Sequence, residues 1–132
     1  MNKLKGIVSG IRSSGELSLV EIKVFEDILT AVVLDHTGIY FAKGKEVHIL
    51  FKETEVALAV ELSGKISLRN KLICRILAIE KGAILTSVKL DYNGLVITSI
   101  ITTPSAELLA LKTESTVTAF VKTNELMLME DE

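Results

Sequence analysis

The sequence predicts an all-β protein made of two small five-stranded barrels in tandem, each with a short helix. Three observations predict this architecture: segments in which apolar and polar residues alternate, turn dipeptides between those segments, and an internal repeat. Alternation with a period of two is typical of strands that bury one face. The repeat indicates that one architecture occurs twice.

The alternation is clearest in residues 17–24 and 84–90, which are also rich in β-branched side chains. Further β runs are predicted at residues 29–34, 47–51, 95–102 and 116–121. The turn candidates are Ser14-Gly15, Lys81-Gly82 and Asn93-Gly94. Asn93-Gly94 is the strongest hairpin signal, because both residues tolerate the positive φ of a tight turn.

Helix is expected only in short pieces. In the second half, Thr103 is predicted to be an N-cap residue, with Pro104 at the first helical position, where its missing N–H costs nothing. The helix that follows is expected to have about two turns.

The repeat divides the chain into two similar halves. Asn2-Lys3-Leu4 returns as Asn70-Lys71-Leu72, residues 29–34 align with 97–102, and residues 52–58 align with 122–128. Each half then holds about five strands and one helical turn, which suits a barrel of the OB type. We expect domains at residues 1–62 and 66–130. Halves this small are expected to pack on each other and on other copies of the chain.

Composition excludes several classes of function. The 132 residues are 48% hydrophobic and contain no apolar run of the ~20 residues that span a bilayer, so a cytoplasmic protein without a membrane partner is expected. Cys74 is the single cysteine, and with only two histidines no metal-ligand spacing occurs. The net charge of −2 and 5% aromatic content disfavour nucleic-acid binding.

The second half resembles a known family. Residues 66–72, Ile-Ser-Leu-Arg-Asn-Lys-Leu, are similar to the S-A-R-N-x-L opening of the Mop (TOBE) family of molybdate-binding domains. Residues 79–82, 97–102 and 121–123 resemble that family's I-x-x-G, I-T-S-I-I-T and V-K-x-S/T signatures. The resemblance covers residues 66–129 and, more weakly through the repeat, 2–60, so the first half is a degenerate copy.

The resemblance implies a function and a ligand. Proteins of this family bind molybdate or tungstate between barrels in dimers or trimers, so we expect oxyanion binding by a homo-oligomer. Storage, homeostasis or sensing of intracellular molybdenum is the implied role. Neither catalysis nor an organic cofactor is expected.

A tetrahedral dianion requires converging cations, hydroxyls and N–H groups. Arg69 and Lys122 are expected to supply the charge, with Lys52 as a contribution from the first half. The remaining candidate ligands are Ser67, Asn70, Thr98, Ser99, Thr102 and Thr123.

The first half departs from the family pattern in two places. No Ser-x-Arg segment precedes Asn2, and Glu53 stands at the position of Thr123. Both changes remove anion donors, and a carboxylate beside Lys52 repels a dianion. The first half is therefore expected to be a packing partner, or to lend only Lys52 and Thr30, which leaves fewer sites than a fully doubled protein has.

Three alternatives remain open. An enzyme is disfavoured because the sequence has no phosphate-binding glycine loop, nucleophile elbow or paired carboxylates at recognisable spacing. A nucleic-acid-binding OB fold is disfavoured by the charge and the scattered aromatic residues. The third alternative is an OB-fold interaction module without a ligand, or the ligand-sensing half of a molybdenum-responsive regulator that acts through a partner.

Overall fold

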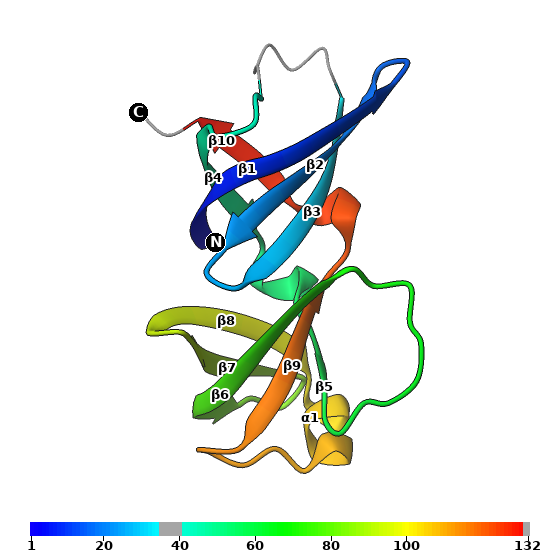
Figure 1. Cartoon of the computed structure of the whole chain (residues 1–132). Coiled ribbons are helices and arrows are strands. Elements are labelled where there is room, and N and C mark those ends of the chain that lie inside the picture. The colour runs from blue at the N-terminus through cyan, green and yellow to red at the C-terminus, as the bar shows by residue number, and fades with distance from the viewer. Residues whose placement is uncertain (35–40, 131–132) are drawn as a thin grey trace.

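The computed structural model, which describes residues 1–34 and 41–130, contains two curled five-stranded sheets that lie one above the other (Figure 1). This confirms the predicted all-β class with two OB-like barrels. The strands are β1 (Asn2–Ser14), β2 (Leu17–Val24), β3 (Asp27–Leu34), β4 (Glu46–Phe51), β5 (Ala57–Ala59), β6 (Asn70–Lys81), β7 (Leu85–Tyr92), β8 (Leu95–Thr102), β9 (Thr116–Val121) and β10 (Met127–Glu130). The helices are η2 (Glu53–Glu55), α1 (Thr103–Leu109) and η3 (Thr123–Glu125), of which η2 and η3 are 3-10 turns.

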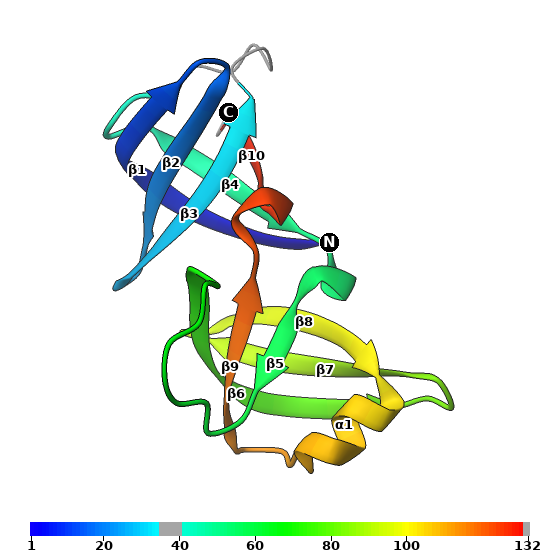
Figure 2. The same cartoon turned by 90° about the vertical axis from the view of Figure 1, so that its right-hand side faces the viewer.

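Each barrel takes its fifth strand from the other half of the chain. The first sheet has the order β10-β4-β1-β2-β3 and the second the order β5-β9-β6-β7-β8, with antiparallel pairing throughout. Figure 2 shows β5 beside β9 in the lower barrel and β10 beside β4 in the upper one. The spatial barrels therefore cross the sequence boundaries expected at residues 62 and 66.

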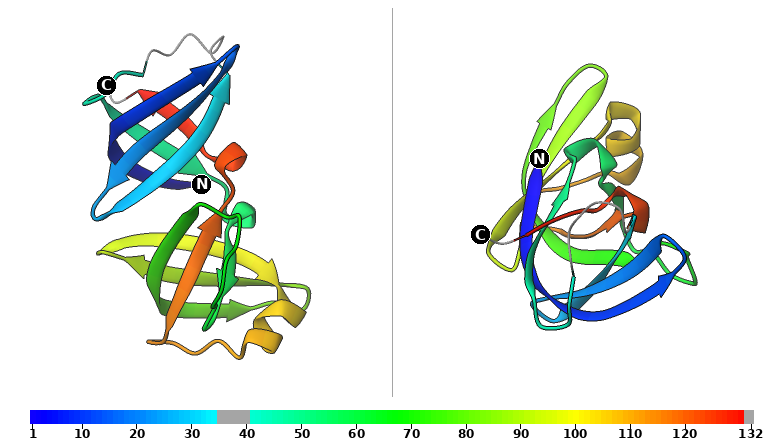
Figure 3. Two further views of the ribbon diagram at one scale, coloured as in Figure 1. Left: turned by 45° about the vertical axis from the view of Figure 1, so that its right-hand side comes forward. Right: turned by 90° about the horizontal axis from the view of Figure 1, so that it is seen from above.

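The alternating side chains form the core. In β1 every second residue from Asn2 to Val8 is buried, and in β6 every second residue from Asn70 to Ile76 is buried. The two patterns are identical, which agrees with the repeat. Burial of an aliphatic side chain contributes about 1.5–3 kcal/mol, so these inward faces hold each sheet in its register. Figure 3 shows the same stacking of the barrels from two further sides.

The predicted turns join the expected strands. Asn93 and Gly94 have φ angles of 50° and 91°, the signature of the two-residue hairpin turn that their sequence predicts. The strands at residues 95–102 and 116–121 have the predicted bounds. Local sequence is thus sufficient to specify the hairpins of the second barrel.

The start of α1 differs from the prediction by one residue. Thr102, not Thr103, is the N-cap, and its hydroxyl accepts a hydrogen bond from the Ser105 N–H at 3.3 Å. Thr103 is buried and its hydroxyl donates to the Gly82 carbonyl at 2.8 Å. The helix expected in the first half has its equivalent position at residues 35–41, of which 35–40 lie outside the described residues. No helix in the described part of the chain is long and apolar enough to span a bilayer.

Candidate oxyanion-binding site at the junctions between the barrels

The two barrels are joined by a pair of asparagine bridges related by the repeat. Asn70, the first residue of β6, bonds to Thr30 of β3, and Asn2, the first residue of β1, bonds to Thr98 of β8. We call the surroundings of these bridges the Asn70 junction and the Asn2 junction. Both lie where one barrel ends and the other begins.

The Asn70 side chain is fully used by the protein. Its Nδ2 donates to the carbonyls of Thr30 at 3.0 Å and Val121 at 2.9 Å, and its Oδ1 accepts the Thr30 N–H at 2.7 Å. The residue is only 1% exposed. Since both amide hydrogens are donated to carbonyls, the Asn70 side chain orders the junction and has no N–H left for a ligand, which differs from the expectation that it is one.

The β6–β9 ladder ends between two cations at the Asn70 junction. Asn70 and Val121 form the last pair of this ladder, and Arg69 and Lys122 are the residues that flank this pair along the chain. Both side chains are exposed, whereas Asn70 and Val121 point into the core. Thr123, the first residue of η3, follows directly and is half-buried. Arg69, Lys122 and Thr123 are therefore the candidate donors that the structure brings together.

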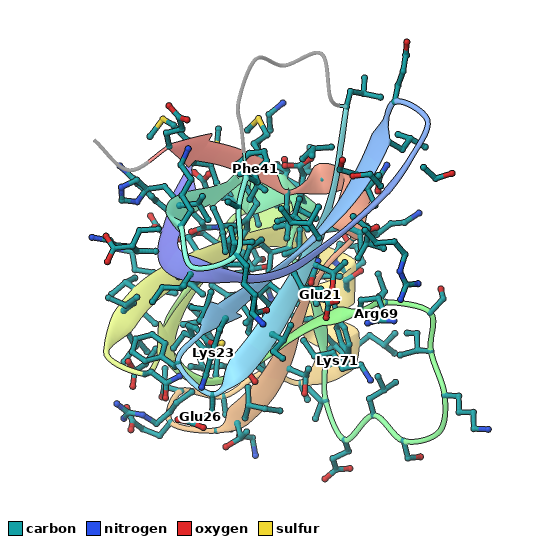
Figure 4. The ribbon with its side chains drawn as sticks, turned by 45° about the horizontal axis from the view of Figure 1, so that its top comes forward. Glu21, Lys23, Glu26, Phe41, Arg69 and Lys71 are labelled. Carbon is teal, nitrogen blue, oxygen red and sulfur yellow. The ribbon has the colours of Figure 1, made fainter. Side chains whose placement is uncertain are left out.

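Further charges surround this junction. Figure 4 shows Arg69 and Lys71 close together at the start of β6, with Glu21 of β2 on the same side of the molecule. Glu21 pairs across the sheet with Thr30, the partner of Asn70, which brings the carboxylate to this region. Glu125, two residues after Thr123 in η3, adds a second carboxylate, so the three cations Arg69, Lys71 and Lys122 lie near two acidic side chains.

The Asn2 junction has a different charge arrangement. Asn2 Nδ2 donates to the Thr98 carbonyl and Asn2 Oδ1 accepts the Thr98 N–H, each at 2.8 Å. The Met1 amino group forms an ion pair with Glu53 Oε1 at 2.6 Å. A hydrogen bond from this amino group lowers the pKa of Glu53. The carboxylate is thus ionised and already paired within the chain.

Four of the remaining predicted ligands lie away from Arg69 and Lys122. Thr98 and Lys52 lie at the Asn2 junction, and the buried Ser99 hydroxyl donates to the Val56 carbonyl at 2.7 Å. Thr102 caps α1. Ser67 is exposed in the connection that leads to Arg69. Within one chain, the predicted set is therefore divided between the two junctions and the start of α1.

Sequence reasoning missed the residues that build the junctions. Asn2 and the backbone of Thr30 hold the barrels together, yet neither carries an obvious ligand signature. The repeat of Asn2 as Asn70 was the available signal, because two asparagines in equivalent places indicate one shared structural role.

Two further groups at the contact between the barrels are structural. Tyr92 of β7 donates to Asp27 Oδ2 at 2.6 Å, and burial raises the pKa of its hydroxyl. Burial also raises the pKa of the Cys74 thiol from 9.0 to about 12, as expected for an inert buried cysteine. Among the described residues no group of three or more His, Cys, Asp or Glu side chains could hold a metal ion.

The chain forms two OB-like barrels that exchange strands and meet at a basic junction, which makes it a tandem barrel protein. Comparisons with known proteins identify its family. Residues 66–128 match the TOBE domain. The cytoplasmic molybdate-binding protein ModG, solved with molybdate bound, is similar over 98% of this chain and 96% of its own, with a TM-score of 0.94 and 32% identity. The chain belongs to the Mop/TOBE family, as a tandem member with two repeats.

Two other relatives show the range of the family. The molybdenum transport protein ModE of Azotobacter vinelandii is 31% identical over 131 residues, which cover 96% of this chain and 48% of ModE. The chain therefore spans about half the length of this curated relative. A molybdate-binding protein from Sporomusa ovata is 36% identical and matches 51% of this chain and 100% of its own, with a TM-score of 0.50. That protein is similar to one repeat.

Proposed function

We propose that the chain binds molybdate or tungstate at the Asn70 junction. Arg69 and Lys122 supply positive charge, Thr123 supplies a hydroxyl, and Asn70 fixes the strands that carry them. The observation that carries this proposal is the end of the β6–β9 ladder, where Arg69 and Lys122 flank the last pair, Asn70–Val121, and concentrate positive charge that an anion can neutralise. The molybdate bound in ModG supports the choice of ligand.

A homo-oligomer, either a dimer or a trimer, completes this site. Arg69 and Lys122 are exposed on one chain, whereas a bound dianion with four acceptor oxygens requires donors on several sides. Candidate donors from a second copy are Ser67 and Thr102, whereas Lys52 and Thr98 lie beside Glu53 at the Asn2 junction. Large apolar side chains that one chain leaves exposed support association; Ile73 is 62%, Ile84 is 76% and Leu108 is 86% exposed.

The biological role we propose is reversible storage or buffering of molybdenum in the cytoplasm, without catalysis and without an organic cofactor. ModG, described as cytoplasmic, is similar over almost its whole length. A second candidate role is the ligand-sensing half of a regulator that acts through a partner. The match to about half of ModE favours this second role over an interaction module without a ligand.

Isothermal titration calorimetry of the purified chain with molybdate, tungstate, sulfate and phosphate tests the proposal. We expect heat from molybdate and tungstate, and a loss of affinity of about 10- to 100-fold in Arg69→Ala, since a charge-assisted hydrogen bond contributes about 1.5–3 kcal/mol. Arg12→Ala, which removes an exposed arginine of β1, is the matched control and should bind normally. Absence of heat with every oxyanion from folded protein would exclude the proposed function.

A further inference from the structure

Glu53 and Thr123 occupy equivalent positions in the two repeats. Each begins a three-residue 3-10 turn after a lysine, and the two lysines have nearly the same backbone angles, φ −75° and ψ 149° at Lys52 against φ −68° and ψ 150° at Lys122. The following residues, Val56 and Leu126, are both buried. The backbone therefore presents side chains 53 and 123 in the same way, and only their chemistry differs.

The cations at the two junctions also correspond. Arg69 and Lys122 flank the last pair of one ladder, Asn70–Val121, and Met1 and Lys52 flank the last pair of the equivalent ladder, Asn2–Phe51. At the Asn2 junction the positive group is the Met1 amino group, 2.6 Å from Glu53 Oε1. Figure 2 shows the N-terminus beside the turn at residues 53–55, between the two barrels.

A carboxylate and a tetrahedral oxyanion make the same kind of contact, because both present anionic oxygens that accept hydrogen bonds from cations. At the Asn2 junction the anionic acceptor is a side chain of the protein, the Glu53 carboxylate. At the Asn70 junction the equivalent residue is Thr123, whose hydroxyl is neutral and can donate. The Asn70 junction thus has the cations of the arrangement but no anion at the position of Glu53.

We propose that Glu53 is a built-in counter-anion, whose carboxylate takes at the Asn2 junction the place that a bound oxyanion takes at the Asn70 junction. This inference rests on the proposed function and deepens it. Glu53 determines how many oxyanions each chain holds, because it fills one of two equivalent places permanently. At the Asn2 junction Glu53 neutralises the Met1 amino group without ligand, whereas at the Asn70 junction the equivalent position carries no charge.

Exchange of the two residues tests the inference. The variant Glu53→Thr gives the first repeat the residue of the second, and Thr123→Glu does the reverse. Glu53→Gln keeps the size of the side chain and removes its charge. Glu16→Thr, in the exposed turn between β1 and β2, is the matched control. Each variant is titrated with molybdate by calorimetry, and its fold is checked by circular dichroism.

We expect Glu53→Thr to increase the number of molybdate ions bound per chain, Glu53→Gln to change that number in the same direction, and Glu16→Thr to leave it unchanged. Thr123→Glu should abolish the binding seen in the original chain. If the original chain binds molybdate and both Glu53 variants, folded, keep its stoichiometry, the inference is wrong while the proposed function stands. If the original chain and every folded variant bind nothing, both are wrong.

Discussion

Replacement of Asn70 by alanine should destabilise the protein more than any other single truncation at the junctions. The change removes three hydrogen bonds at a residue that is 1% exposed and leaves the Thr30 N–H and the carbonyls of Thr30 and Val121 without partners. Each orphaned buried group costs about 1–3 kcal/mol. Because entry of water and local relaxation recover part of that sum, we expect a loss of about 3–5 kcal/mol in the free energy of unfolding.

Urea unfolding followed by circular dichroism, at one fixed protein concentration, measures this loss. Asn2→Ala removes two partly buried hydrogen bonds to Thr98, so its expected cost is smaller, about 1–3 kcal/mol. Asn124→Ala, at an exposed position, is the control and should change stability by less than about 0.5 kcal/mol. The reasoning is refuted if Asn70→Ala costs less than about 1 kcal/mol, or if Asn2→Ala costs more than Asn70→Ala.

Three further predictions concern the contact between the barrels and the first sheet. Because burial raises the Cys74 pKa from 9.0 to about 12, the folded state keeps the thiol neutral, and the free energy of unfolding should fall as pH rises from 9 towards 12. A thiol reagent at pH 8 should label only urea-unfolded protein. Rapid labelling of the folded protein would contradict this expectation. Tyr92→Phe removes the 2.6 Å hydrogen bond to Asp27 and should lower the free energy of unfolding, measured in urea, by about 1.5–3 kcal/mol. An unchanged urea midpoint would mean that this hydrogen bond does not stabilise the fold. Gly6→Ala places a Cβ 2.5 Å from Ile22 Cγ2, so we expect a loss of about 2–3 kcal/mol by thermal unfolding, and a neutral effect would mean that β1 and β2 separate easily.

The strands, the hairpins and the repeat could be predicted from the sequence because each depends on local chemistry. Alternation sets the buried face, and Asn93-Gly94 sets the turn. The N-cap of α1 was wrong because Thr102 and Thr103 are both threonines before Pro104, and capping chemistry alone does not distinguish them. Local patterns therefore give element type more accurately than element ends.

Strand exchange could not be predicted for a different reason. The repeat makes β4 and β9 similar, with burial patterns that differ only at Leu50 and Phe120, so the local pattern does not indicate which of β5 and β10 pairs with which strand. The family motif identified Arg69, Lys122 and Thr123, which do share a junction. It could not separate them from Thr98 and Lys52, because membership of a junction is decided by which strands pair across the two halves.

The exchanged strands make the two barrels mechanically inseparable. The segment from β9 through η3 to β10 is threaded from the second barrel into the first, and β4 through η2 to β5 runs the opposite way. Pulling the barrels apart would strip a strand from each sheet and expose both interiors to water. A protease cut in the exposed Ser63-Gly64-Lys65 connection should therefore leave two fragments that remain associated, because each supplies a strand to the sheet of the other. The tandem chain therefore resembles a strand-exchanged dimer of two repeats that are covalently linked.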